Sequence, residues 1–468
     1  GRRGGRDAGG APWPGWGAAG LVEKRNIKNI LPFHLIQGQD RTRKCRQQLG
    51  GGFVGTSTDG IDVRTFEDMT DLERLHALVR LETPSLDAAA ASQIIEMLAG
   101  WWRAVGADVR IVAGGSGPHL VAELPGIGDP VLLVGHCDTV WPHGTLTGDV
   151  PWSVDGDIVR GPGVYDMKSG LVVMLSAAQR LRGRAHRAVR VVVVCDEEVG
   201  SPDSRPLIGE CVQGVSAVIG FESPHPDGAL KVGRRGSTRV RLAVTGKASH
   251  AALDPAGGIS AVDELVDQLM AVRDLVTDPT LPTEVLCNIG TVNGGGAANV
   301  VPAHAEAEIG LRFIDRESET RVLDGFAALR PIRTGAGLDV EVLSQRPSWP
   351  ASTADTGWLG TIADVARGIG QSVTGRPAAG AGDTNLTGGL GIPTADGFGP
   401  SGGGAHAVTE HASLATLWRV IEQDGKPGGG APWGGWREGP APRGGPCRSE
   451  RDRHSPNAVS MISFCSTA

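Results

Sequence analysis

The stretch Val131-Leu-Leu-Val-Gly-His-Cys-Asp-Thr-Val140 decides the fold. A short apolar run bounded by glycine is typical of a strand that is buried on both faces of a parallel sheet. In open α/β sheets, ligands bind at the carboxyl ends of such strands, where His136 and Asp138 would lie. In extended backbone these two side chains point the same way, so Asp138 can orient a metal-binding His136. A single His after a strand is more often structural, so a metal site here requires further ligands from elsewhere in the chain.

Two later apolar runs also end in acidic residues. Residues 189–194 precede Cys195-Asp-Glu-Glu198, and residues 217–221 precede Glu222. Neighbouring carboxylates raise one another's pKa unless cations neutralise them, although most acidic runs are solvated loops. Three successive strands would therefore present a His, a pair of Glu residues and a further Glu at one sheet edge.

Two loops complete the set of candidate ligands. Asp166 ends the stretch Gly161-Pro-Gly-Val-Tyr-Asp166, just before a helix expected at 169–181. A solitary Asp in this place is otherwise read as a helix cap or a turn former. His406 lies in a glycine-rich loop that precedes a short helix expected near 410–423.

Imidazole and carboxylate ligands together suit Zn²⁺. One ion would take His136 and Glu222, the other would take Glu198 and His406, and Asp166 would bridge them. Two such ions activate a shared water and stabilise a tetrahedral intermediate. Glu197, left unligated, is the natural general base and later the acid that protonates the leaving amine, while Asp138 fixes His136. We expect two Zn²⁺ per subunit, with Co²⁺ or Mn²⁺ as alternatives.

The periodicity predicts an α/β catalytic part in two pieces, at 61–234 and 346–424, which flank an α+β insertion at 235–345. The insertion combines alternating strands near 239–245, 306–313 and 338–343 with helices near 258–276 and 317–329. Before it, helices are expected from 66 to 81 and from 87 to 105. The ends, 1–60 and 425–468, are basic and rich in Gly, Pro and Trp, and are expected to be disordered tails.

Composition restricts the partners and the compartment. The longest apolar runs fall short of the roughly 20 residues that span a bilayer, and the basic ends carry no recognised nucleic-acid-binding motif. We therefore expect neither membrane nor nucleic acid as a partner. Seven cysteines without paired spacing argue against a disulfide framework and indicate a reducing, cytoplasmic setting. Cys137 is interpreted as a small strand-end residue, with a reactive thiol as the alternative.

The chain resembles the dizinc exopeptidase and deacylase family of glutamate carboxypeptidase, acetylornithine deacetylase and succinyl-diaminopimelate desuccinylase. The resemblance covers about residues 60–424 and implies a mostly parallel-sheet catalytic domain interrupted by an α+β, ferredoxin-like, dimerisation or lid domain. It also implies a homodimer and a cis peptide bond after Asp166. The motifs that carry it are Gly135-His-Cys-Asp-Thr139, Gly161-Pro-Gly-Val-Tyr-Asp166, Asp196-Glu-Glu-Val-Gly-Ser201, Phe221-Glu222 and Gly404-Ala-His406.

Within that family the chain is most similar to the glutamate carboxypeptidase branch, which has Glu where Glu222 stands. The resemblance implies that His250 reaches the partner subunit's site and stabilises the oxyanion. It also implies that Asn299 and Arg312 contact the substrate, with Arg312 on the terminal carboxylate. Lys231 and Arg346 match further carboxylate-binding cations, and Asp383 matches a site-support position without an assigned role.

The sequence therefore predicts a zinc metallo-carboxypeptidase that hydrolyses an amide bond. Its substrate would be a small N-acyl amino acid or short peptide, from which it releases a C-terminal, acidic and glutamate-like residue. A deacylase of the acetylornithine or succinyl-diaminopimelate type is one alternative. An inactive metal-binding interaction protein is an alternative from another class.

Overall fold

The computed structural model describes residues 66–421, so the two expected tails lie outside the described residues. Its larger sheet has six strands in the order β1-β2-β6-β3-β7-β16. The four strands β6, β3, β7 and β16 are parallel, whereas β1 and β2 pair antiparallel at one edge. The strands are β1 (Asp108–Val112), β2 (His119–Leu124), β3 (Ile127–His136), β6 (Arg187–Val194), β7 (Ala217–Gly220) and β16 (Thr394–Ala395).

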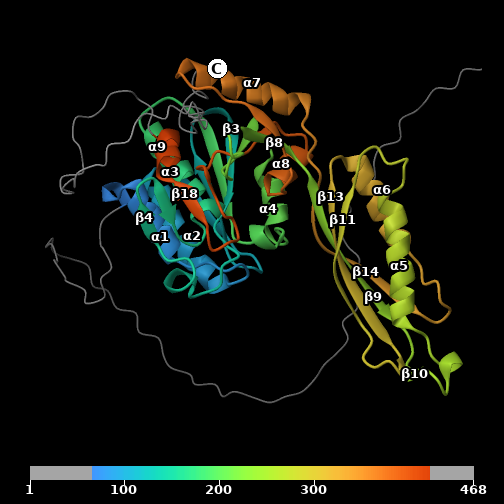
Figure 1. The fold of residues 1–468 in the computed structure, drawn as a ribbon. Helices are drawn as coiled ribbons and strands as arrows, with labels where there is room; N and C mark the ends of the chain where they lie inside the picture. Colours follow the sequence, from blue (N-terminus) through green and yellow to red (C-terminus); the bar gives the residue numbers. More distant parts are fainter. Residues whose placement is uncertain (1–65, 422–468) are drawn as a thin grey trace, which may run out of the picture. The chain divides into compact units, whose positions relative to one another are not determined.

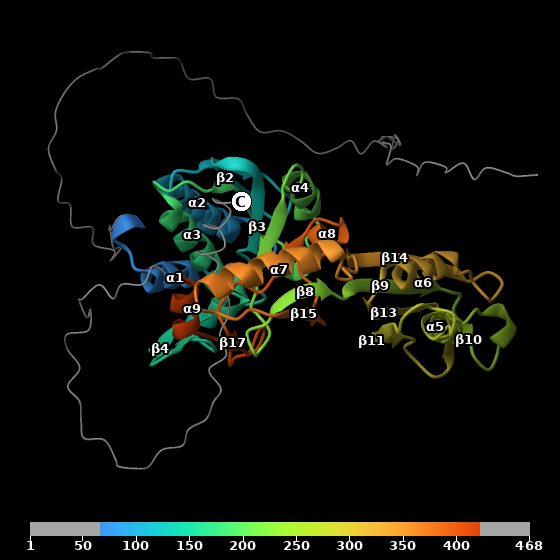
Figure 2. The ribbon, with the colours of Figure 1, turned by 90° about the horizontal axis from the view of Figure 1, so that it is seen from above.

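Helices cover both faces of this sheet, because neighbouring residues of each central strand point to opposite sides. On β3, Leu133 belongs to one apolar cluster, whereas Leu132 and Val134 belong to the other. Figures 1 and 2 show helices packed on both sides. The main ones are α1 (Asp71–Arg80), α2 (Ala88–Ala104) and α3 (Ser169–Leu181) on the first side, and α4 (Ser204–Cys211) and α8 (Thr384–Gly389) on the second. The predicted α/β class is confirmed.

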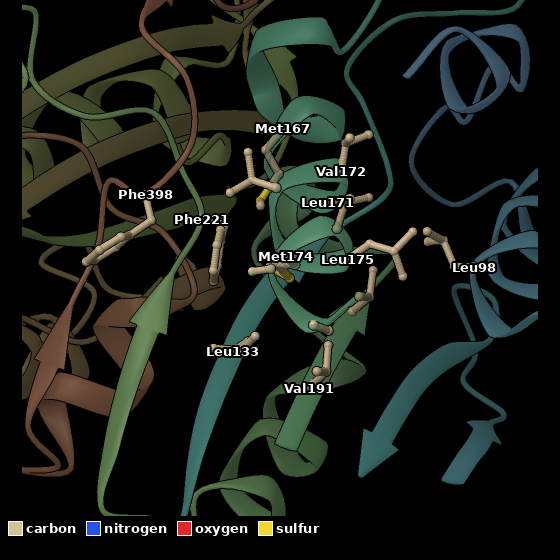
Figure 3. Packing of buried hydrophobic residues seen from close by; sticks show 14 of the residues in the cluster. Leu98, Leu133, Met167, Leu171, Val172, Met174, Leu175, Val191, Phe221 and Phe398 are labelled. Carbon is tan, nitrogen blue, oxygen red and sulfur yellow. The ribbon is translucent and has the colours of Figure 1, made fainter. Parts of the chain in front are cut away.

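The helix α3 packs closely against the end of β3. A Cβ added at Gly135 would lie 2.6 Å from the Cε of Met174, so glycine permits this approach. Figure 3 shows Met174 and Leu175 of α3 facing the sheet strands that carry Leu133 and Val191. Since α3 begins directly after the Asp166 loop, this packing holds the loop against the carboxyl end of β3.

The second sheet is antiparallel and has its own apolar core. Its chain order is β-α-β-β-α-β and its strand order is β11-β13-β9-β14, which is the ferredoxin-like arrangement that the resemblance implied. Apolar residues at alternate positions of β9, from Val240 to Val244, pack with both helices on one face (Figure 1). The elements are β9 (Gly236–Thr245), α5 (Ala261–Val276), β11 (Leu286–Gly294), β13 (His304–Phe313), α6 (Arg316–Ala328) and β14 (Gly337–Arg346).

Several elements differ from the prediction, among them an edge strand and the last helix. The edge strand β11 was not predicted, because its residues are exposed or only half-buried and its apolar residues, Leu286, Cys287, Ile289 and Val292, do not strictly alternate with polar ones. The predicted helix at 410–423 is wrong in its first turn, since β18 (His411–Ser413) pairs with β5 before α9 (Leu414–Ile421) begins. The remaining elements are β4 (Ser153–Asp155), β5 (Ile158–Arg160), β8 (Leu230–Arg234), β10 (Ser249–His250), β12 (Val300–Val301), α7 (Thr353–Gly368), β15 (Gly375–Ala378) and β17 (Gly402–Gly403).

Candidate functional site

Three adjacent parallel strands deliver the candidate residues to one edge of the larger sheet. The central strand β3 ends at His136, β6 runs into Glu197 and Glu198, and β7 runs into Glu222. These residues meet because β3 lies between β6 and β7 and all three run in the same direction. The expected convergence of strand ends is therefore observed.

Asp166 lies between two groups of side chains. Its Oδ1 is 3.2 Å from Nε2 of His136, and its Oδ2 is 3.4 Å from Nε2 of His406. Glu222 Oε1 lies 3.4 Å from the same His136 nitrogen, and Glu198 Oε2 lies 3.1 Å from the same His406 nitrogen. All five predicted ligands thus come together, and each carboxylate oxygen of Asp166 faces a different imidazole.

The ligand-type side chains in this cluster form a candidate metal site. Ligand atoms of His136, Asp166 and Glu198 lie within 4.8 Å of one another. Hydrogen bonds to Asp166 and Glu198 raise the pKa of His406 to about 10. Burial opposes a charge on His136, yet hydrogen bonds to carboxylates raise its pKa well above its ordinary value. The negative charge of these carboxylates, which favours a proton on each imidazole, also favours a metal cation beside it. Imidazole and carboxylate ligands suit Zn²⁺.

Asp138 was predicted to orient His136, and in the structure it also contacts the residues that follow β6. Its backbone carbonyl accepts from Nδ1 of His136 at 3.0 Å, which turns Nε2 of the ring toward Asp166. Its carboxylate accepts the backbone N–H groups of Glu197 and Glu198 at 3.1 and 3.2 Å. Ser85 donates to the same carboxylate at 2.7 Å. Asp138 therefore orients the imidazole and also anchors the acidic turn.

Glu410 is a supporting residue that the sequence reasoning missed. Its carboxylate accepts backbone N–H groups of Gly163, Tyr165 and Asp166 at 3.0–3.2 Å, and the indole N–H of Trp141 at 2.6 Å. Four donors on one carboxylate fix the loop that carries Asp166. The Asp166–Met167 peptide bond is cis, as the resemblance implied. The only signal for Glu410 in the sequence was its place four residues after His406.

Glu197 is buried beside a guanidinium. Burial raises its pKa well above the ordinary value, and the positive charges of Arg346 and His136 oppose that rise. Nη2 of Arg346 lies 2.8 Å from Oε1 of Glu197 and 3.3 Å from Oγ of Ser201. A carboxyl group with a raised pKa is suited to exchange protons near neutral pH. Arg346 was predicted to bind a substrate carboxylate. In the structure it instead forms ion pairs with Glu197 and Asp383.

Two further predicted cations lie near this cluster. Nζ of Lys231, on β8, is 3.5 Å from Oγ of Ser223, and burial and the nearby Arg234 lower its pKa. Arg312, on β13, donates to the carbonyl of Leu311, and burial followed by the charge of Arg346 lowers its pKa. Their roles in substrate contact stay predictions.

The structure does not bring His250 and Asn299 to the five clustered side chains. His250 lies on β10 opposite Val300, and its Nδ1 accepts the N–H groups of Ala252 and Leu253. Asn299 accepts the N–H of Ala251 through its carbonyl. Both residues are exposed. Among the contacts of residues 66–421, none joins either residue to the predicted ligands.

A buried ion pair supports the Glu222 side of the cluster. Nη2 of Arg234 lies 2.5 Å from Oδ2 of Asp396, and Oδ1 of Asp396 accepts the backbone N–H of Glu222 at 3.3 Å. Asp396 directly follows β16, the next parallel strand beyond β7. It therefore continues the pattern of acids at strand ends, which could have identified it from the sequence.

Cys137 is buried between His136 and Asp138, and burial raises the pKa of its thiol well above the ordinary value. A thiol of this kind is unreactive, so the small strand-end interpretation holds.

Residues 132–422 match the model of peptidase family M20/M25/M40. The chain belongs to this family. It is 31% identical to carboxypeptidase G2 from Pseudomonas sp. (strain RS-16), and the match covers 54% of this chain and 62% of that protein. It is 27% identical to succinyl-diaminopimelate desuccinylase from Gluconacetobacter diazotrophicus, and this match covers 74% of the chain and 92% of the relative.

Solved structures of M20 peptidases share the fold. A metallo-carboxypeptidase from Sulfolobus solfataricus superposes with a TM-score of 0.60 at 16% identity, covering 75% of this chain and 97% of that one. The aminopeptidase PepT from Bacillus cereus gives a TM-score of 0.57 at 20% identity, covering 76% and 97%. The relatives of the chain include carboxypeptidases and deacylases, so the chain is an M20 metallopeptidase or amidohydrolase. Within residues 66–421, no helix is long and apolar enough to cross a membrane.

Proposed function

We propose that this M20 protein is a zinc carboxypeptidase that releases a C-terminal, acidic amino acid from N-acyl or short peptide substrates. The observation that carries the proposal is the position of Asp166, whose two oxygens face His136 and His406 separately while Glu197 lies close by. One cation would be held by His136, Glu222 and Asp166, and the other by Asp166, Glu198 and His406. Zn²⁺ suits these ligands, and Co²⁺ or Mn²⁺ could replace it.

When bound, the two cations supply electrophilic activation of the attacking water and of the scissile carbonyl. Glu197 takes a proton from that water as it attacks the carbonyl carbon. The same carboxyl group then gives the proton to the leaving amine nitrogen, so Glu197 both accepts and returns the proton. Arg346 keeps Glu197 oriented through its 2.8 Å ion pair. Asp138 keeps the backbone of Glu197 in place.

The preference for an acidic product rests on cations near the cluster. Arg312 and Lys231 carry positive charge, and Arg312 has no carboxylate partner among the described ion pairs. A guanidinium grips a carboxylate through two parallel hydrogen bonds. The likeness to carboxypeptidase G2 supports the release of a C-terminal residue.

We further propose that residues 235–345 form a dimerisation or lid domain, and that residues 61–234 and 346–424 form the catalytic domain. His250 and Asn299 would then serve the active site of the partner subunit in a homodimer. Both residues are exposed, and among the described residues neither contacts the predicted ligands. These two observations support a role outside their own subunit.

The second candidate is a deacylase, because the desuccinylase match spans 92% of that relative. Metal analysis with a panel of N-acyl amino acids separates the two. We expect two metal ions per subunit and at least tenfold higher kcat/KM for acetyl-glutamate than for its neutral isostere acetyl-glutamine. Faster turnover of acetylornithine than of acetyl-glutamate would favour the deacylase. Bound metal without any turnover would refute both enzymes and favour a metal-binding interaction protein.

A further inference from the structure

A cavity of about 460 Å³ shares no lining residue with the candidate metal cluster. It lies where the chain enters and leaves the four-stranded sheet. Its walls come from Arg235, which directly follows β8, from the segment after β14 at Trp349, and from β15 at Pro377. A volume of this size is within the usual range for small-molecule sites.

The charge of the cavity lining is positive. Two arginines and no carboxylate line the cavity. The first, Arg234, is already neutralised by Asp396 and also donates to the carbonyl of Gly380. The second, Arg235, makes no side-chain hydrogen bond or ion pair with residues 66–421, and its Nη1 is buried. A buried guanidinium nitrogen without a partner is costly, and a carboxylate is the ligand that best satisfies it.

The rest of the lining is apolar. Ile314, Pro350 and Pro377 are exposed around the cavity, whereas the indole of Trp349 is fully buried and donates to Asp355, so Trp349 contributes backbone to the lining. Such walls favour a ligand with an apolar body next to its charged group. We propose that this cavity binds a small aromatic or similarly apolar carboxylate, with Arg235 as the residue that grips the carboxylate.

Hydrogen bonds link the cavity to both chain segments that join the two sheets, the one before β9 and the one after β14. The backbone N–H of Arg235 donates to the carbonyl of Ala378, and its carbonyl accepts from Nδ2 of Asn385. The same Asn385 amide donates to Pro347, in the segment that leaves β14. A ligand bound here therefore contacts the segment that enters β9 and the segment that follows β14. It acts on turnover without competing with the substrate.

The probe is benzoate, added to the full metal-loaded chain, with benzyl alcohol as the uncharged control. We expect benzoate to raise the melting temperature saturably and benzyl alcohol to have no effect. Arg235→Gln should weaken benzoate binding at least tenfold. Ala379→Phe, which fills the exposed rim, should abolish binding even if the arginine variant folds poorly. Arg376→Gln is the matched control, because Arg376 adjoins the cavity-lining Pro377 but is paired with Asp227, and it should leave binding unchanged.

Three outcomes would overturn the proposal. The first is a thermal shift of the same size in Arg235→Gln, which would place benzoate elsewhere. The second is competition between benzoate and the acyl amino acid in the wild type and Arg235→Gln alike, which would place it in the metal cluster. The third is the absence of saturable binding up to about 10 mM benzoate. A small ligand with one charged contact is expected to bind more tightly than that.

Discussion

Nη2 of Arg346 lies 2.8 Å from Oε1 of Glu197. Arg346 is the last residue of β14 in the four-stranded sheet, whereas Glu197 comes after β6 in the six-stranded sheet. The ion pair therefore links the end of one sheet to the proton-carrying residue of the other. Any change that moves β14 also changes the electrostatic surroundings of Glu197.

Replacing Glu197 by Gln should reduce kcat by about 10²–10⁴-fold, because the amide cannot accept the proton of the attacking water. The bound metal should stay near two ions per subunit, since Glu197 is not among the proposed ligands. Turnover and metal content are measured on the same preparation. Retained turnover would remove Glu197 from its proposed role, and loss of metal would make it a ligand.

Replacing Arg346 by Met should move the acidic limb of the kcat/KM profile to higher pH. Burial raises the pKa of Glu197 and the charge of Arg346 opposes this rise, so removing that charge raises the pKa further. A base with a higher pKa is deprotonated only at higher pH. The profile is measured from about pH 5 to 9.

Arg239→Met provides the matched control. Arg239 lies on the same antiparallel sheet but pairs with Glu308 on an exposed face. It should leave the profile unchanged. An acidic limb that stays in place in Arg346→Met would mean that the guanidinium does not act on Glu197.

Much of the site could be predicted from the sequence because it depends on strand ends. His136, Glu198 and Glu222 each come after an apolar run, and parallel strands bring such ends together. The helix expected at 169–181 has the same bounds as α3. Its apolar face, from Leu171 to Leu181, begins within a few residues of the Asp166 loop, so both the helix and the loop could be predicted.

Supporting contacts could not be predicted, because they depend on loop geometry. Glu410 comes after a glycine-rich loop and lies 244 residues from Asp166 in the chain, yet its carboxylate accepts that residue's N–H. The strand β11 was missed for a related reason. It is an edge strand that pairs with β13 and is at most half-buried, and the apolar residues in its sequence do not strictly alternate with polar ones.

Replacing Glu410 by Gln should weaken metal binding by about 10–100-fold, the usual cost of losing a support for a ligand. The carboxylate accepts three backbone N–H groups around Asp166, and an amide offers only one acceptor oxygen. Competition with a metal chelator measures the affinity. Glu82→Gln is the control, because Glu82 also accepts two backbone N–H groups, at Gly144 and Leu146, and should not change metal affinity.

Replacing Asp396 by Asn should destabilise the fold by about 3–5 kcal/mol, because it leaves the buried Arg234 charge unpaired. Chemical denaturation measures this change. The effect should depend on pH. Burial opposes the charge on Asp396, but Arg234 and Lys231 hold its pKa below the ordinary value of about 3.9. Its stabilising contribution is therefore complete above about pH 4 and is lost as the pH falls through the lowered pKa of the folded state.

The difference in unfolding free energy between wild type and Asp396→Asn should accordingly shrink at acidic pH. Asp227→Asn tests whether burial is the cause, because Asp227 pairs with Arg376 on the surface. Exposed pairs contribute little, so this variant should be close to wild type. Equal destabilisation by the two variants would contradict the role given to the buried pair.

Mixed dimers test whether His250 acts across subunits. His250→Ala should lower kcat without changing metal content, since the described contacts of His250 are with its own loop. Glu197→Gln should lower kcat for a separate reason. If His250 serves the partner subunit, a mixed dimer contains one site with Glu197 intact and an intact His250 supplied from the other chain. Activity should then return to about half of the wild-type value per mixed dimer. Mixed dimers that stay as inactive as the two parents would show that each subunit uses its own His250.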